Sequence, residues 1–407
     1  MIEVSQELIE TICFLIQEYM QSHLRELSNY HFDEKLDNYL YEILYTQLYP
    51  LQESMNITTI IDKGIQEARE IYYKHIMPRR SYHSTFVTKP VNICKMKKRI
   101  QQLRDIPQPN QRTDDWHKFR YRLITASNAY KAYGSQAKQN ELICEKCKPL
   151  SFEKSNSKNM DTPFHWGIKY EPISVQYYEH VYNTTIEDFG CLPHPIYPFL
   201  GASPDGINVK PDAPFFGRML EIKNPTTREI TGIPKEEYWI QMQLQMEVCG
   251  LNHCDFLETK FIEYESHEAF QADGTFQQTP TLQYKGIIIA FIENDTIKYE
   301  YPPFQCTKEE YNTWEVEIME KHSENTWLKN VYWKLDHVSC ILVGRNKQWF
   351  QETLHCLENI WDIIEKERVS GKWTERKPKS NQRKRTTTIG NEESKPIGKL
   401  IIDMSDI

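Results

Sequence analysis

Gly201-Ala202-Ser203-Pro204-Asp205-Gly206 is followed along the chain by Leu220-Glu221-Ile222-Lys223, in which Glu221 stands sixteen residues after Asp205. The first segment places Asp205 in a tight Pro-Asp-Gly turn, next to an apolar, strand-like run that ends at Leu200. Because side chains alternate between the two faces of a strand, Glu221 and Lys223 should share one face while Ile222 points into the core. The two segments therefore predict a sheet with an acid–lysine pair on one face and a second acid in a turn.

These residue types suit the hydrolysis of a phosphodiester. Asp205 and Glu221 offer carboxylate oxygens, the ligands that Mg²⁺ prefers, and the backbone carbonyl of Ile222 offers another oxygen. A bound metal polarises a phosphoryl oxygen and lowers the pKa of a water molecule, while Lys223 can orient that water and stabilise developing negative charge. Taken alone, an E-x-K triplet is more often a solvated strand face, and a Pro-Asp-Gly turn is ordinary. A metal-dependent active site therefore needs support from other motifs.

The segment 111–370 alternates between helix-like and strand-like stretches. Helical patterns cover 122–133, 165–182, 235–250, 307–322 and 346–369, and strand patterns cover 185–191, 199–209, 218–223, 253–264 and 283–300. Mixed elements in this order predict an α/β or α+β domain, with a central, partly antiparallel sheet flanked by helices.

The chain before this segment has a helical pattern. Residues 1–78 carry apolar side chains at three-to-four spacing, and 92–104 have the pattern of a short basic helix that is ended by two prolines. We therefore expect a helical accessory region over 1–105 and the mixed domain over 106–371.

The composition changes again near the C-terminus. From Lys372 to Arg385 seven basic residues stand against one acid, Glu375, and no apolar periodicity accompanies them. We expect 372–407 to be a basic, disordered tail. Such a tail can act as a nuclear localisation segment or a DNA tether, or it can be solvated charge alone.

Composition narrows the class of protein only broadly. The 407 residues, 39% of them hydrophobic, can form one large domain with appendages or two to three domains. The net charge of −8 neither indicates nor excludes a nucleic-acid-binding protein, because a nuclease needs only a local basic track. No apolar run approaches the ~20 residues that span a bilayer, and the acidic N-terminus lacks a secretory leader, so an intracellular protein is expected.

The ten cysteines lack the dense spacing of a disulfide scaffold, so reduced thiols are expected. Cys144 and Cys147 have the spacing of a zinc half-site, and Cys191 with His194 could complete four ligands. The second pair is unlike a standard knuckle. Free thiols are therefore the default expectation, and a structural zinc site is not expected.

Further motifs surround the acid–lysine set on both sides. In chain order they are Gln111-Arg112-Thr113-Asp114-Asp115-Trp116-His117-Lys118-Phe119-Arg120, Ile124-Thr125-Ala126-Ser127, Trp166-Gly167-Ile168-Lys169-Tyr170-Glu171 and Tyr238-Trp239-Ile240-Gln241-Met242-Gln243-Leu244-Gln245-Met246. With these motifs, residues 111–370 resemble the phage lambda-type exonucleases, also called the viral recombinase (YqaJ-like) or alkaline exonuclease group. These are PD-(D/E)xK nucleases of phages and large DNA viruses, and the resemblance implies a restriction-endonuclease-like core.

The resemblance also implies roles for single residues. Asp205 and Glu221 match the metal-binding acids, and Lys223 matches the catalytic lysine. Glu171 matches a helix-borne acid that approaches the metal directly or through water, although by itself it reads as a surface acid on an amphipathic helix. Gln243 falls on the active-site glutamine of the family.

The glutamines have a simpler reading as a polar helix. Gln241 and Gln245 share one helical face with each other, and Gln243 cannot share that face.

Three further positions match DNA contacts of the family. Arg120 and Ser127 match phosphate-binding positions, which suits a guanidinium fork and a hydroxyl donor. Arg228 matches a basic position near the DNA. The simpler reading of the second motif is a helix start capped by Thr125 or Ser127, and the two readings are compatible.

The activity that the resemblance implies is processive, Mg²⁺-dependent digestion of one strand of duplex DNA from its 5′ end, with Mn²⁺ as a substitute metal. The product is a 3′ single-stranded overhang, and the implied partners are double-stranded DNA ends and a single-strand annealing protein. The phage enzymes form a homotrimer, whereas related enzymes of large DNA viruses can act as monomers, in the host cytoplasm or nucleus. Residues 1–105 have no counterpart in the minimal phage form and could block trimerisation, add a DNA-binding surface or dock a partner.

Two alternatives share the same residues. A structure-specific or resolvase-like PD-(D/E)xK endonuclease would have the same metal centre and would differ only in cutting DNA without ends. A non-catalytic recombination scaffold would have lost a metal acid or the lysine, and Asp205, Glu221 and Lys223 are all present.

Overall fold

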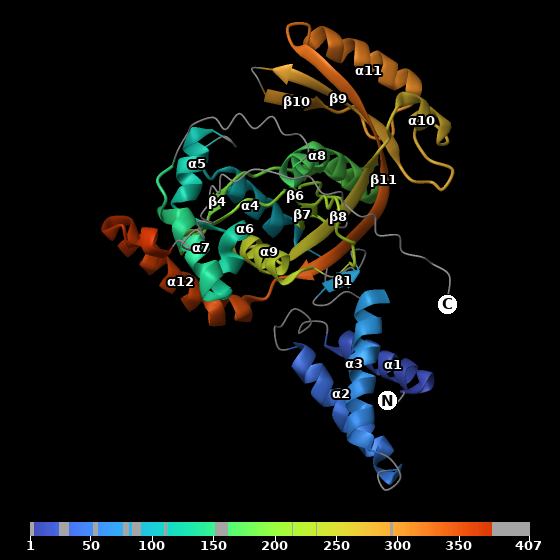
Figure 1. Cartoon of the computed structure of the whole chain (residues 1–407), viewed down its shortest axis with the longest axis vertical. Helices are drawn as coiled ribbons and strands as arrows, with labels where there is room; N and C mark the ends of the chain where they lie inside the picture. The colour runs from blue at the N-terminus through green and yellow to red at the C-terminus, as the bar shows by residue number, and fades with distance from the viewer. Residues whose placement is uncertain are drawn as a thin grey trace, which may run out of the picture.

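The computed structural model describes residues 4–23, 32–51, 56–75, 81–83, 91–109, 111, 113–150, 162–213, 215–232, 234–293 and 296–376. A bundle of three helices at the N-terminus lies beside a larger body in which helices surround a curled mixed sheet (Figure 1). Within these residues, no helix combines the length and the apolar character that crossing a membrane would require. The predicted α/β class with an N-terminal helical region is confirmed.

The N-terminal bundle is held by apolar stripes at helical spacing. It comprises α1 (Gln6–Ser22), α2 (Phe32–Leu48), η1 (Tyr49–Leu51) and α3 (Ile57–His75). Ile12, Leu36 and Ile61, one from each helix, are fully buried in a common core. Leu342 of the main sheet joins this core, so the bundle packs against one end of the larger body.

The main sheet has the strand order β10-β9-β11-β8-β7-β6-β3, and β1 pairs with β11. The pairing of β7 with β8 is parallel and the other pairings are antiparallel. The strands are β1 (Ser81–His83), β3 (Ile186–Glu187), β6 (Gly206–Asn208), β7 (Met219–Lys223), β8 (His253–Glu263), β9 (Lys285–Glu293), β10 (Thr296–Glu300) and β11 (Thr326–Gly344). A small second sheet contains β2 (Ile124–Thr125), β5 (Leu200–Ala202) and β4 (Leu192–Pro193).

Helices cover both faces of the main sheet. The helical elements of the body are α4 (Ile93–Arg104), α5 (Asp114–Tyr121), α6 (Ala126–Ala129), η2 (Tyr130–Tyr133), α7 (Gln136–Cys147), α8 (Pro163–Tyr182), α9 (Glu236–Cys249), α10 (His267–Ala272), α11 (Lys308–Lys321), α12 (Lys347–Ser370) and η3 (Lys372–Arg376). The largest apolar core joins α9, α12, α7 and α4 to one face, whereas Tyr178 of α8 packs on Leu220, Ile222 and Leu257 of the other face. α10 and α11 cover the outer part of the sheet around β9 and β11 (Figure 1).

The long strand β11 was not predicted from the sequence pattern. It pairs with β9 along its first part and with β8 along its second part. The register shifts between Trp327 and Lys329 and again between Leu335 and His337. Each shift interrupts the period-two alternation by which a strand is recognised, so the segment did not read as one strand.

The predicted boundary at residue 105 is placed too late. Ile100 and Leu103 of α4 are buried in the largest core of the body, and Arg99 Nε donates a hydrogen bond to the carbonyl of Cys249 at 2.7 Å. The predicted basic helix exists, but its apolar face packs on the body, so the boundary falls between α3 and α4.

The first five residues of the expected tail are helical in the structure. Lys372–Arg376 form η3, where the guanidinium of Arg376 forms an ion pair with Glu367. The rest of the predicted tail lies outside the residues that the structure describes.

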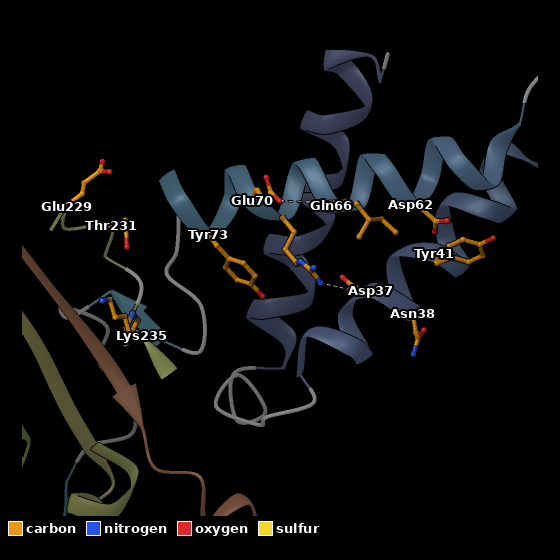
Figure 2. Close-up of a pocket in the computed structure, with 13 residues that line it drawn as sticks. Asp37, Asn38, Tyr41, Asp62, Gln66, Glu70, Tyr73, Glu229, Thr231 and Lys235 are labelled. Atoms are coloured by element: carbon orange, nitrogen blue, oxygen red, sulfur yellow. Dashed lines mark hydrogen bonds and ion pairs between the residues drawn. The ribbon is translucent and has the colours of Figure 1, made fainter. Parts of the chain in front are cut away.

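A cavity of about 930 Å³ lies between the bundle and the segment 229–235 of the body. Figure 2 shows Asp37 of α2 and Tyr73 of α3 on one side, with Glu229, Thr231 and Lys235 on the other. We call this cavity the interdomain groove. None of Asp205, Glu221 and Lys223 lines it, so the predicted catalytic residues lie elsewhere.

Candidate active site

β7 brings the predicted acid–lysine pair to one face of the sheet. Leu220 and Ile222 pack toward α8, so the alternate residues Glu221 and Lys223 face the opposite layer, which contains α9. Glu221 is fully buried, and Lys223 is half-buried. The predicted alternation along this strand is therefore confirmed.

The turn before β6 brings Asp205 to the same strand. Asp205 Oδ2 accepts a hydrogen bond of 2.6 Å from the backbone N–H of Ile222. In an extended strand the N–H and C=O of one residue point to the same side, so the Ile222 carbonyl also faces the Asp205 side. Gly206 makes the turn possible because a Cβ at this position would collide with Ile186.

Three donors converge on the Glu221 carboxylate. Gln241 Nε2 donates to Oε1 and Gln245 Nε2 donates to Oε2, each at 2.6 Å. The Lys223 ammonium forms an ion pair with Oε1. Gln245 Nε2 also donates to the carbonyl of Ser203 at 3.2 Å, which ties α9 to the loop that carries Asp205. The position of the Glu221 carboxylate is thus fixed by its neighbours.

Gln243 does not reach the carboxylates, which corrects its predicted place in the site. Its Nε2 donates to the Gly344 carbonyl at 2.9 Å, and its Oε1 accepts from the Asn346 N–H at 2.6 Å. Gln243 therefore links α9 to the end of β11 and the start of α12. Gln241 and Gln245 occupy the place expected of Gln243, and their shared helical face is the sequence signal that indicated them.

Like charges crowd this site. Burial first, and then the nearby Glu221 carboxylate, raise the pKa of Asp205 well above its usual range, and Glu171 of α8 acts in the same direction. Burial disfavours the Lys223 ammonium, but Glu221 and Asp205 outweigh burial and raise the pKa of Lys223. Three acids therefore share the site with one lysine, an arrangement that a further cation would stabilise.

The donor set fits Mg²⁺ in chemistry and in number. Asp205, Glu221 and the Ile222 carbonyl offer only oxygen atoms, with Glu171 close enough to influence Asp205. Across the described part of the chain, no three His, Cys, Asp or Glu side chains cluster closely enough to hold a metal by themselves. Mg²⁺ is usually bound by one or two carboxylates, several waters and substrate phosphates rather than by a protein cage, so this set is sufficient.

Arg120 of α5 lies beside the Asp205 loop. Its Nη1 donates to Ser203 Oγ at 3.0 Å, and its guanidinium lies 4.6 Å from the centroid of the Trp116 ring. Ser127 is exposed near the start of α6, with its Oγ 3.2 Å from Thr125 Oγ1. Thr125 caps α6 in a capping box, so the simpler reading of this motif as a helix start is confirmed and is compatible with a phosphate contact.

Arg228, which the sequence analysis placed near the DNA, forms its contacts with other residues of the protein. Its Nη2 forms an ion pair with Glu258, a buried residue of β8, and its guanidinium lies 5.6 Å from the centroid of the Tyr238 ring. The structure therefore places Arg228 beside Tyr238 and pairs it with the Glu258 carboxylate.

The two residue pairs that were considered for a zinc site make separate contacts. Cys144 Sγ donates to the Trp373 carbonyl and Cys147 Sγ to the Ile364 carbonyl, each at 3.5 Å. His194 Nδ1 accepts from the backbone N–H groups of Ile196 and Tyr197, at 3.1 Å and 3.0 Å. Each of these side chains has a local structural role.

Comparison with known proteins shows that part of the chain is similar to a family of viral proteins. Residues 115–252 match the family model of the YqaJ-like viral recombinase domain. The uncharacterized protein R354 of Acanthamoeba polyphaga mimivirus is 31% identical over 333 residues, which cover 72% of this chain. The chain spans 58% of the length of that relative.

Among solved structures, the chain is similar to an alkaline exonuclease (LHK-Exo) from Laribacter hongkongensis. The identity is 18% with a TM-score of 0.37, over 65% of this chain and 98% of the exonuclease. The complex of LHK-Exo with dAMP gives 19% identity over the same shares of the two chains, with a TM-score of 0.37.

The segment matched by the family model extends from α5 to the end of α9. It contains the Asp205 turn, the acid–lysine pair of β7 and both glutamines that hold Glu221. The segment that is similar to the YqaJ-like viral recombinase domain, residues 115–252, therefore contains the residues that the sequence predicted for the site.

Proposed function

We propose that this protein is a Mg²⁺-dependent exonuclease that degrades one strand of duplex DNA from its 5′ end and leaves a 3′ single-stranded overhang. The observation that supports it best is that Lys223 pairs with the Glu221 carboxylate, that Gln241 and Gln245 hold this carboxylate in place, and that Asp205 lies near enough for Glu221 to raise its pKa. The match of residues 115–252 to the YqaJ-like family model agrees with the proposal. The polarity rests on the resemblance of the motifs to the lambda-type exonucleases.

The chain's own residues have distinct tasks in this reaction. Asp205, Glu221 and the Ile222 carbonyl would hold Mg²⁺, which when bound polarises the phosphate and acidifies a water. Lys223 can donate a hydrogen bond to the attacking water or to the phosphate oxygen that gains charge. Gln241 and Gln245 keep Glu221 in one orientation, so no reorganisation is needed during the reaction.

Contacts with the DNA backbone form the second part of the proposal. Arg120 lies beside the Asp205 loop, and Ser127 is exposed on the neighbouring helix start. We propose that both bind phosphates next to the cleaved bond. Because the proposed product is a 3′ overhang, the proposed partner is a single-strand annealing protein. We propose that the enzyme acts as a monomer or a homotrimer, wherever DNA ends occur in the host cell.

The test uses linear duplex DNA labelled separately at its 5′ and 3′ ends, together with a covalently closed circle, in Mg²⁺. Wild type should release the 5′ label first and leave the circle intact. Glu221→Gln should lower the rate by about 10³-fold or more, since metal binding supplies several kcal/mol of transition-state stabilisation. Glu268→Gln, which changes an exposed glutamate of α10, is the matched control and should keep the wild-type rate.

Each alternative predicts a different result. Cutting of the circle by wild type, with Glu221→Gln inactive, would keep the metal centre and identify an endonuclease. No cleavage of either DNA would favour the non-catalytic scaffold. Equal rates for wild type and Glu221→Gln would exclude the proposed site.

A further inference from the structure

A second buried acid lies next to Lys223 on the neighbouring strand. Lys223 of β7 and Glu258 of β8 are paired residues in the parallel ladder. Paired residues of adjacent strands project from the same face of a sheet, so Glu258 lies on the face that carries Glu221. Only 1% of the surface of Glu258 is exposed, so its carboxylate is buried beside the site.

One oxygen of this carboxylate has no hydrogen-bond donor. Glu258 Oε1 forms an ion pair with Arg228, whereas Oε2 is buried and accepts no hydrogen bond from any described residue. A buried carboxylate oxygen without a donor is costly and requires an explanation. Burial raises the pKa of Glu258, although Arg228 and Lys223 both act to lower it, which indicates that a further positive charge would be accommodated here.

The ring of Tyr238 lies close to two of the cations that act on Glu258. The Lys223 ammonium lies 5.1 Å from the ring centroid and the Arg228 guanidinium lies 5.6 Å from it. An ammonium that moves from Glu221 toward Glu258 can therefore stay near the electron-rich ring face, where a cation is stabilised.

The present position of Lys223 conflicts with metal binding. Its ammonium contacts Glu221 Oε1, one of the two oxygens that this carboxylate offers to a divalent cation. A divalent cation on the carboxylate would repel the ammonium, because the two positive charges would lie only a few ångströms apart in a buried site. This repulsion favours movement of Lys223 away from Glu221 when a metal binds, and neighbouring strands are only ~4.8 Å apart, within reach of a lysine side chain.

We propose that Glu258 is the second partner of Lys223. When Glu221 binds a divalent cation, the Lys223 ammonium moves across the strand gap to Oε2 of Glu258, which then holds it beside the reacting phosphate. Glu258 is thus a positioning residue that acts through Lys223. This inference rests on the proposed function for the identity of the metal, but its test measures metal binding and not cleavage.

The experiment is Mg²⁺ titration of the full-length protein by calorimetry without DNA. Glu258→Gln keeps the shape and removes the charge, so Lys223 has no second partner and Mg²⁺ should bind about 10-fold more weakly. Asp255→Asn is the matched control, because Asp255 is also a buried acid of β8 with an arginine partner, Arg218 at 3.1 Å. Asp255 is paired with Leu220, on the opposite face of the sheet, and its variant should bind Mg²⁺ as wild type does.

A double-mutant cycle identifies the residue through which Glu258 acts. With Lys223→Met, the further change Glu258→Gln should not alter Mg²⁺ affinity. Wild-type affinity in Glu258→Gln would overturn the proposal, and so would an unchanged effect of Glu258→Gln in the Lys223→Met background. If Glu258→Gln lacks a cooperative thermal transition, Glu258→Asp replaces it in the same cycle, because the shorter acid must also weaken binding. A wild-type protein that binds no Mg²⁺ would instead overturn the proposed function, and this inference with it.

Discussion

The N-terminal bundle and the larger body use acidic residues in opposite ways. Residues 1–75 contain thirteen Asp and Glu against five Lys and Arg, so the chain's net charge of −8 resides there and the remaining residues balance. In the body, Glu221, Asp255 and Glu258 are buried and each has a cationic partner. In the bundle, Asp62 and Glu70 are exposed at the interdomain groove.

This difference bears on the role of the accessory region. A surface that binds the phosphate backbone needs positive charge, and the bundle has a large excess of negative charge. Of the three roles considered for it, a DNA-binding surface therefore fits least. Docking a basic partner or limiting assembly agrees better with its charge.

The largest effect is expected where the two regions meet. Leu342 of β11 is fully buried in the core of the bundle. Leu342→Ala should destabilise this contact by about 2–5 kcal/mol, because it leaves a cavity that neighbouring helices cannot fill. Calorimetry should then show the bundle unfolding before the body, and limited proteolysis should cleave between α3 and α4.

Exposed Ile262 of β8 provides the control for this substitution. Ile262→Ala should leave both unfolding transitions unchanged. A single, unshifted transition for Leu342→Ala would mean that the two regions are not joined through this residue.

The next effect separates two glutamines of α9. Gln245→Met removes a donor from Glu221, the proposed metal ligand, and should lower the rate of the proposed cleavage by about 10- to 100-fold, because residues that orient a metal ligand typically contribute this much. Gln243→Met breaks the contacts with Gly344 and Asn346 and should cost about 1–3 kcal/mol of stability with little change in rate. The reverse outcome, a large rate loss only in Gln243→Met, would restore Gln243 to the site.

The same helix shows how far the sequence alone could lead. Strand alternation was enough to place Glu221 and Lys223 together, because the period of a strand is local. Helical spacing joined Gln241 with Gln245 but could not say which face of α9 meets β7, since that depends on how the helix packs. The resemblance therefore selected Gln243, and only the packed structure shows Gln241 and Gln245 at Glu221.

Two other features were hidden for different physical reasons. The two register shifts of β11 disrupted its alternation, so the strand that joins β9 to β8 was missed. α4 displays many lysines on its exposed side, which concealed Ile100 and Leu103 as a packing face. The sequence carries no pattern that indicates the role proposed for Glu258, because that role depends on Lys223 of the neighbouring strand.

Lowering the pH should have a smaller effect on folding stability, through a histidine at the end of the sheet that supports the bundle. Burial, aided by Arg218, lowers the pKa of His253 at the start of β8 to about 4. His253 is neutral when folded, so its contribution to stability is complete above its ordinary pKa and is lost as the pH falls from there toward 4. Between pH 7.5 and 5.5 wild type should lose about 1 kcal/mol that His253→Gln does not lose.

Thermal unfolding at the two pH values measures this loss. His337→Gln, at an exposed position of β11, should follow the wild-type pH dependence. Identical pH dependence in wild type and His253→Gln would show that His253 does not differ between folded and unfolded states.

The smallest effect tests whether the acidic bundle repels DNA from the groove. Neutralising Asp62 and Glu70 together, as Asp62→Asn and Glu70→Gln, should tighten DNA binding about two- to threefold at low salt, because each change removes a negative charge from the lining of the interdomain groove. The gain should vanish near 0.5 M salt, where screening confines such repulsion to a few ångströms. Neutralising the exposed Glu7 and Glu10 of α1, which do not line the groove, is the matched control and should change affinity less. Weaker binding in the groove variant would mean that these acids support a surface that DNA uses, and the idea that the acidic bundle repels DNA would then fail.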